Sequence, residues 1–229
     1  MKNIKVIAFD ADDTLWINET FFSEAESRFA RILSEYGEEE DLIPELFQTE
    51  TQNIPFYGYG IKGFTLSLLE TALKVSKHKV KASQIQEIID LSKEMIQKPV
   101  ELLDGVETVL QNLKGRAYKM VVATKGDLLD QQRKLRKSNL ESYFHHIEVM
   151  SDKQESDYQQ LIQHLDIKAE EFLMIGNSIK SDILPVLSLG FSAVHIPFHT
   201  TWIHEVVDPV KHEKLTTLES ITELPALLK

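Results

Sequence analysis

The chain has 229 residues, of which 42% are hydrophobic, so it can bury a full core as one domain or as a main domain with a smaller insert. Its 25 Lys and Arg stand against 36 Asp and Glu, and the formal net charge of −11 makes nucleic acid and anionic membranes poor partners. The absence of Cys excludes disulfides, thiolate catalysis and Cys-based metal sites. The apolar run before Asp10 is too short for a secretion signal or a membrane span, so we expect a cytoplasmic protein.

The first predicted element is a strand at 5–9, where V-I-A-F shows no polar alternation and therefore suits a strand buried on both faces. After a long helical stretch, strand and helix signals alternate along the rest of the chain. The expected helices cover 102–113 and 127–137, and the expected strands cover 118–123, 147–150, 171–175 and 192–196. This alternation predicts an α/β fold with a doubly wound, parallel, Rossmann-like sheet, which binds ligands beyond the carboxyl ends of its strands.

The stretch 18–98 breaks this alternation because it is helical almost throughout. Apolar residues recur in it at helical spacing, and Gly37 and Pro99 are placed to end helices. We therefore expect an α/β core formed by 1–17 and 99–229, with 18–98 inserted as a helical cap.

The cap contains a segment rich in Gly and aromatic residues, P-F-Y-G-Y-G-I-K-G at 55–63, which we interpret as a shaped loop. Two roles remain open for it, a turn whose aromatics belong to the core or a loop that faces substrate. In the second case the cap would close over the site and gate turnover. The acidic run at 38–41 is expected to be a solvated helix start.

Three acidic residues directly follow the first strand, in I-A-F-D-A-D-D-T-L-W. Burying carboxylates at a strand end without partners is costly, and a divalent cation together with a phosphoryl group would account for Asp10 and Asp12. The alternative is that Asp12, Asp13 and Thr14 form a turn and cap a helix, a role that suits Asp13 in particular.

This segment resembles the first motif of the haloacid dehalogenase-like phosphatases, a D-x-D-x-T-L pattern after a hydrophobic strand. Three further segments match in order and spacing over nearly the whole chain. Thr124 resembles the family's hydroxyl that binds a phosphoryl oxygen, and Lys153 resembles the Lys that clamps the nucleophile and the phosphoryl group. G-N-S-I-K-S-D, with Asn177 and Asp182, resembles the metal motif G-D-S-x-x-x-D. Taken singly, Thr124 and Asp182 could be helix caps and Lys153 a surface residue.

The resemblance implies a phosphohydrolase in which Asp10 attacks phosphorus and is transiently phosphorylated. Asp12 would protonate the leaving group and then activate water, while Thr124 and Lys153 would bind the phosphoryl group. The expected substrate is a small phosphorylated metabolite whose identity the sequence leaves open.

The resemblance also implies Mg²⁺ as cofactor. It would be held by the Asp10 side chain, the Asp12 backbone carbonyl, Asn177 and Asp182, the last either directly or through water. Asn177 departs from the family pattern, in which an Asp is usual. Because an amide oxygen carries no net charge, we expect weaker metal binding than in a chain with that Asp.

Asp12 argues against the dehalogenase and phosphonate-cleaving branches of the superfamily, which lack an acid at this position. A phosphomutase of the same superfamily retains it, and a non-catalytic binding module on the same fold is a further alternative. His195, His199 and His204 lie close together in sequence, but Pro197 argues against a helical zinc pair, so we expect loop packing for them. The oligomeric state is left open.

Overall fold

The computed structural model describes residues 3–228. In this part of the chain six strands form one parallel sheet in the order β3-β2-β1-β4-β5-β6. The strands are β1 (Val6–Phe9), β2 (Lys119–Lys125), β3 (Ile147–Met150), β4 (Phe172–Gly176), β5 (Ser192–His195) and β6 (Leu215–Thr217). The parallel α/β fold predicted from the sequence is confirmed. β6 was not predicted, because a three-residue strand on the sheet edge carries no hydrophobic pattern of its own.

The chain divides into two compact units. The α/β unit holds the described residues of Met1–Glu19, Val100–Lys125 and Gln131–Lys229. The helical unit holds Thr20–Pro99 and Gly126–Asp130.

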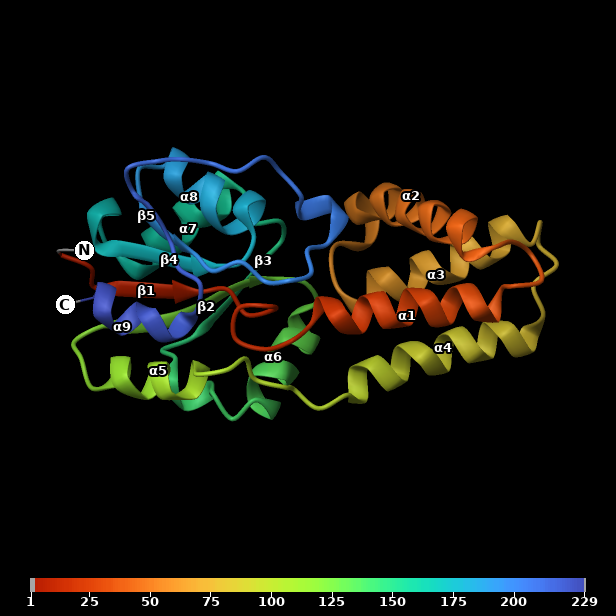
Figure 1. The fold of residues 1–229 in the computed structure, drawn as a ribbon, viewed down its shortest axis with the longest axis horizontal. Coiled ribbons are helices and arrows are strands. Elements are labelled where there is room, and N and C mark those ends of the chain that lie inside the picture. Colours follow the sequence, from red (N-terminus) through yellow and green to blue (C-terminus); the bar gives the residue numbers. More distant parts are fainter. Residues whose placement is uncertain (1–2, 229) are drawn as a thin grey trace. The chain divides into compact units, whose positions relative to one another are not determined.

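The sheet of the α/β unit has helices on both faces (Figure 1). Successive β1 side chains point to opposite faces, so Ile7 and Phe9 pack with α5 (Val106–Lys114) and α9 (Leu224–Leu227). Val6 and Ala8 pack on the other face with α7 (Glu155–Leu165) and α8 (Leu184–Ser188). α6 (Leu128–Lys137) follows β2, and a π-helical turn at Ile179–Ile183 precedes α8.

The helix expected at 102–113 begins four residues later than predicted, at Val106. Leu102 instead pairs with Trp16 in an isolated antiparallel bridge, and Gly105 takes a φ of 80° immediately before the helix. Because a residue in the left-handed region cannot be part of a right-handed helix, α5 can begin only after Gly105.

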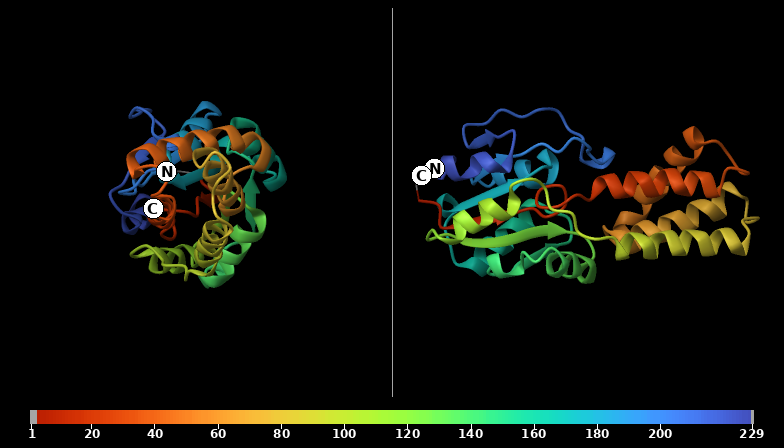
Figure 2. Two further views of the ribbon diagram at one scale, coloured as in Figure 1. Left: turned by 90° about the vertical axis from the view of Figure 1, so that its right-hand side faces the viewer. Right: turned by 60° about the horizontal axis from the view of Figure 1, so that its bottom comes forward.

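The helical unit contains α1 (Glu19–Ile32) from its second residue on, α2 (Glu39–Tyr57), α3 (Ile61–Val75) and α4 (Ala82–Gln97) (Figure 2). Their apolar faces meet in one core that includes Phe29, Leu46, Leu68 and Leu91. The exposed acidic residues Glu39, Glu40 and Asp41 form the first turn of α2, as predicted. None of the described helices is long and apolar enough to cross a membrane.

The prediction of a loop over the whole of 55–63 is wrong. α2 continues through Tyr57, α3 begins at Ile61, and the break between the two helices is confined to 58–60. α2 includes Pro55, although a Pro has no N–H to donate and disfavours the interior of a helix. Gly60 has a φ of 102°, and a Cβ on it would lie 2.7 Å from the backbone nitrogen of Asp127, so a larger residue would not fit this turn.

Candidate active site

At the carboxyl edge of the sheet, the predicted site residues follow β1, β3 and β4 or, for Thr124, lie near the end of β2. β1 and β4 are neighbours at the point where the strand order reverses, which is where open α/β sheets bind ligands. Asp10 directly follows β1 and Asn177 directly follows β4. The backbone nitrogen of Asp10 donates to the Ile175 carbonyl over 2.8 Å, so Asp10 is fixed against the end of β4.

Asp10 is buried, with 6% of its surface exposed, and each carboxylate oxygen has a donor. Lys153 Nζ forms an ion pair with Oδ1, and the Thr14 hydroxyl donates to Oδ2 over 3.0 Å. Lys153 is only 2% exposed and donates through the same nitrogen to Asp182 Oδ1 over 2.6 Å. Lys153 is therefore a buried bridge between two carboxylates rather than a surface residue.

Burial dominates the electrostatics of this trio. It raises the pKa of Asp10 from 3.8 to about 7, with Lys153 opposing the change and Asp182 adding to it. For Lys153, burial disfavours the charged form, but Asp10 and Asp182 outweigh it and raise the pKa of the ammonium group above its ordinary value. Two buried carboxylates thus share one ammonium group, and the imbalance favours a further cation in the site.

Asp182 is held against the end of β4 by a close approach to Gly176. A Cβ on Gly176 would overlap the Asp182 carboxylate, so this position accepts only a glycine. Asp182 Oδ2 accepts from the Ser178 backbone nitrogen over 3.0 Å, while Oδ1 faces Lys153. Ser178, not Asp182, caps the following turn, since its hydroxyl oxygen accepts from the Ser181 nitrogen.

The Asn177 amide meets oxygens of the first motif. One of its terminal atoms lies 3.2 Å from each of Asp10 Oδ2, the Asp12 carbonyl oxygen and Thr14 Oγ1. With its NH₂ group at that position, the amide donates to these oxygens. With its oxygen there, the Asn177 oxygen, Asp10 Oδ2 and the Asp12 carbonyl oxygen converge as ligands suited to a hard cation. The donor set therefore fits Mg²⁺. Within residues 3–228 no group of three or more His, Cys, Asp or Glu side chains is arranged to hold a metal, so such an ion would also rely on amide and backbone oxygens.

Asp12 directs its carboxylate to a different set of partners. Trp16 Nε1 and Gln131 Nε2 each donate to it over 2.7 Å, and Lys134 Nζ contacts both of its oxygens at 2.7 and 2.9 Å. Asp13 takes the capping role considered from the sequence, because its carboxylate accepts from the backbone nitrogens of Asn18 and Glu19 at the start of α1.

Comparison with known proteins places this chain in a family. The model of haloacid dehalogenase-like hydrolases matches residues 4–190, which is most of the chain. The chain belongs to the haloacid dehalogenase-like hydrolases.

A solved haloacid dehalogenase-like family hydrolase from Xanthomonas campestris is 34% identical, covers 99% of this chain and 91% of its own, and superposes with a TM-score of 0.89. A curated glyceraldehyde 3-phosphate phosphatase from Pyrococcus furiosus is 23% identical over 100% of this chain and 93% of its own length. The HAD hydrolase YfnB of Bacillus subtilis, solved with magnesium bound, is 18% identical with a TM-score of 0.63, covers 99% of both chains and shares the fold. The family and the hydrolase chemistry predicted from the sequence are confirmed.

Thr124 is the predicted site residue of this hydrolase that makes no contact with the others. It is buried in β2, and among the described residues its hydroxyl makes only a 3.4 Å hydrogen bond to the neighbouring Lys125 carbonyl. It does not cap α6, since Asp127 Oδ1 accepts from the Asp130 nitrogen there. The hydroxyl is thus able to donate to another acceptor at the carboxyl edge of β2.

Sequence reasoning assigned no role to Trp16, Gln131 or Lys134 and considered Thr14 only as part of a turn and helix cap. Each of the four contacts Asp10 or Asp12. The Thr of the D-x-D-x-T-L pattern was a usable signal for Thr14. Gln131 and Lys134 are more than a hundred positions from Asp12, and on sequence alone they are ordinary polar residues of a helix.

A buried polar network lies beside Asp182. Glu205 accepts hydrogen bonds from Lys125 and from the hydroxyls of Ser178 and Ser181. Burial alone would raise the pKa of Glu205, but Lys125 and the hydroxyls lower it by more, so it lies below its ordinary value. The network ties the loop after β5 to the turn that carries Asp182.

The histidines considered for zinc make local ring contacts. His199 packs on Phe198 and His204 packs on Trp202, with ring centroids 4.0 and 4.3 Å apart. His195 Nε2 lies 3.0 Å from the Asn177 carbonyl oxygen. These are the loop contacts expected from the sequence.

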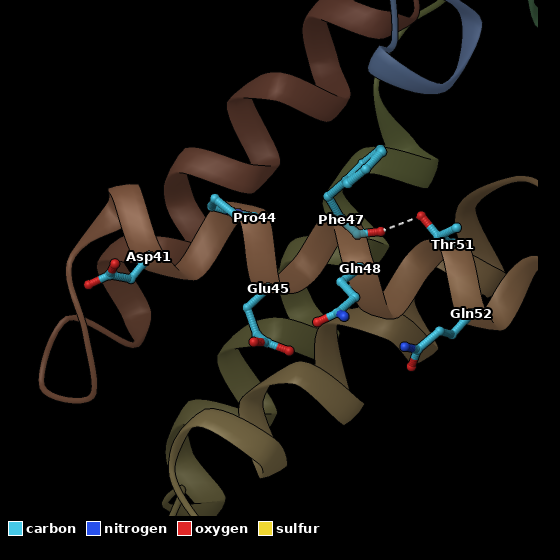
Figure 3. A pocket seen from close by; sticks show the side chains of 7 residues that line it. All are labelled: Asp41, Pro44, Glu45, Phe47, Gln48, Thr51 and Gln52. Carbon is cyan, nitrogen blue, oxygen red and sulfur yellow. Dashed lines mark hydrogen bonds between the residues drawn. The ribbon is translucent and has the colours of Figure 1, made fainter.

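A hollow of about 490 Å³ lies in the helical unit along the side of α2. Its lining residues are Asp41, Pro44, Glu45, Phe47, Gln48, Thr51 and Gln52, all from this one helix (Figure 3). The Thr51 hydroxyl donates to the carbonyl of Phe47, one turn earlier, over 2.8 Å. The hollow contains none of the predicted site residues, and its one-helix lining gives it no converging polar groups.

Proposed function

We propose that this hydrolase is a Mg²⁺-dependent phosphatase that cleaves a small phosphorylated metabolite through an aspartyl-phosphate on Asp10. The observation that carries the proposal is the buried Asp10 carboxylate, with Lys153 on one oxygen and Thr14 on the other, at the sheet edge where such folds bind ligands. The curated relative from Pyrococcus furiosus, a phosphatase of a three-carbon sugar phosphate, supports the reaction class. We propose the helical unit as the cap, which would select the leaving group.

In the first step Asp10 attacks phosphorus, a bond forms between its carboxylate oxygen and phosphorus, and the bond from phosphorus to the leaving oxygen breaks. Asp12, which must carry a proton at this stage, gives it to that leaving oxygen and is left as the carboxylate that Trp16, Gln131 and Lys134 contact. Lys153 and the Thr124 hydroxyl stabilise the charge on the transferring oxygens. Thr14 supports this arrangement because its hydrogen bond restricts rotation of the Asp10 carboxylate.

In the second step Asp12, now ionised, accepts a proton from water, whose oxygen attacks phosphorus. The bond between Asp10 and phosphorus breaks, inorganic phosphate forms and the carboxylate is restored. The same residue thus acts first as acid and then as base, which requires its carboxylate to be held in one place through both steps.

Mg²⁺ would be held by the Asp10 carboxylate, the Asp12 carbonyl and Asn177. Asp182 lies near this set, because Lys153 contacts both Asp10 and Asp182. The ion would supply positive charge toward the phosphoryl oxygens. The raised pKa of Asp10 supports this assignment, because a cation beside the carboxylate would favour the ionised form that a nucleophile needs. The magnesium bound to the relative YfnB is consistent with it.

Phosphate release from p-nitrophenyl phosphate and from a panel of phosphorylated metabolites tests the proposal, with Mg²⁺ and with EDTA. We expect release that depends on Mg²⁺ and is abolished in Asp10→Asn, together with a phosphoenzyme that is trapped by acid quench in the parent only. A bisphosphate product would identify a mutase. No turnover of any substrate at millimolar Mg²⁺ would identify a non-catalytic module and refute the proposal.

A further inference from the structure

Both oxygens of the Asp12 carboxylate accept hydrogen bonds from groups of the protein itself. The carboxylate accepts four hydrogen bonds from three residues: one from Trp16, one from Gln131 and two from Lys134. A carboxylate held this way cannot swing freely between rotamers, so these three donors fix its orientation.

The donors are themselves held in place. Trp16 is buried, and its backbone pairs with that of Asp12 in an isolated bridge. This pairing brings the Trp16 indole next to the Asp12 carboxylate, to which it donates. Gln131 is buried on α6 and also donates to the Lys125 carbonyl over 3.1 Å. Lys134 lies one turn further along the same helix, with most of its side chain covered.

Lys134 differs from the other two donors because its further contact is with Asn18, near the end of the first segment of the α/β unit. Its Nζ also donates to Asn18 Oδ1 over 3.0 Å. Asn18 is next to Glu19, the last residue of the first segment of the α/β unit, and the backbone nitrogens of both are capped by Asp13. One ammonium group therefore joins Asp12 to the segment through which the chain leaves the α/β unit.

We propose that Lys134 is a positioning residue, which holds the Asp12 carboxylate for proton transfer and couples its placement to Asn18 at the exit of the α/β unit. The proposal rests on the acid and base role given to Asp12 above. An exit segment that moves would carry Asn18 with it and alter the hold of Lys134 on Asp12. We place Lys134 on the Asp12 carboxylate rather than on the substrate, so we expect its effect on turnover to pass through Asp12.

The leaving group separates this role from a merely structural one. Loss of the acid matters when the departing alkoxide is basic, as in ethyl phosphate, and matters little for the phenolate of p-nitrophenyl phosphate. The quantity to compare is kcat/KM, which reports steps up to the first cleavage of phosphorus and oxygen. In Lys134→Met we expect kcat/KM for ethyl phosphate to fall about 10- to 100-fold and that for p-nitrophenyl phosphate to fall less than about 3-fold.

Three variants control the experiment. Arg136→Met removes an exposed charge from the same helix and should change neither value. Lys134→Arg retains the cation and should recover part of the selective loss. Asn18→Ala leaves Lys134 and its contacts with Asp12 in place, so it tests the coupling even if Lys134→Met is poorly folded. It should cause a selective loss of about 2- to 5-fold that adds nothing in the Lys134→Met background.

Equal losses with both substrates, or no loss in Lys134→Met, would overturn the positioning role while leaving the phosphatase proposal intact. Additive effects of Asn18→Ala and Lys134→Met would overturn the coupling. A parent protein that hydrolyses neither phosphate would overturn both proposals, because no proton transfer by Asp12 would then remain to be positioned.

Discussion

Glu50 is the buried acid for which the structure gives the clearest quantitative consequence. It lies on α2 inside the helical unit with 8% of its surface exposed, and burial, together with Glu26 on α1, raises its pKa from 4.5 to about 8. Replacing it with Gln keeps the size and removes the ionisation.

The sign follows from the direction of this pKa change. Glu50 takes up a proton more readily in the folded chain than in the unfolded one, so its contribution to stability is complete below about pH 4.5 and is lost as the pH rises through 8. Between pH 5 and pH 8 this loss amounts to about 3 kcal/mol. Glu50→Gln should therefore be near neutral at pH 5 and more stable than the parent by about that amount at pH 8.

Urea unfolding followed by circular dichroism at four pH values between 5 and 8 measures the difference. Glu87→Gln, an exposed residue of α4, should give a difference that does not change with pH. Glu26→Gln should give a smaller version of the Glu50→Gln effect, since it removes only the neighbouring charge. If the difference in unfolding free energy between Glu50→Gln and the parent is the same at pH 5 and pH 8, then ionisation of Glu50 does not destabilise the folded protein and the reasoning is refuted.

Three other substitutions test the site. Gly176→Ala should displace Asp182 and lower kcat by about 10²-fold. The control Gly115→Ala should leave kcat unchanged, because its Cβ would meet nothing closer than 3.6 Å. Equal activity of the two variants would contradict the close approach of Asp182 to Gly176. Asn177→Asp should tighten Mg²⁺, seen as a larger rise in Tm with added Mg²⁺, and a smaller rise would disprove the proposed ligand. Lys153→Met leaves the buried carboxylates of Asp10 and Asp182 without their cation, so it should lower the free energy of unfolding by about 3 kcal/mol and abolish phosphoenzyme formation. A variant that is as stable and active as the parent would contradict the role of Lys153 between these two carboxylates.

The sequence alone determined the architecture and the catalytic candidates. Apolar runs in the sequence predicted five of the strands nearly to the residue, because buried parallel strands are short, continuous apolar runs that local composition reveals. Asp10 and Asn177 could be placed together for the same reason, since each directly follows one of these runs. The break at 58–60 was misjudged as a longer loop, because aromatic and Pro residues there also fit helices.

Only the tertiary structure decided how the charges pair. Lys153 reads as a surface lysine in its own segment, and its burial between Asp10 and Asp182 exists only when three strand ends meet. Likewise Lys134 meets Asp12 across 122 positions, through a contact between a loop and a helix that no local pattern encodes. Hydrophobic periodicity is set by neighbours in the chain and can be read from it, whereas the pairing of buried charges depends on which distant elements pack together.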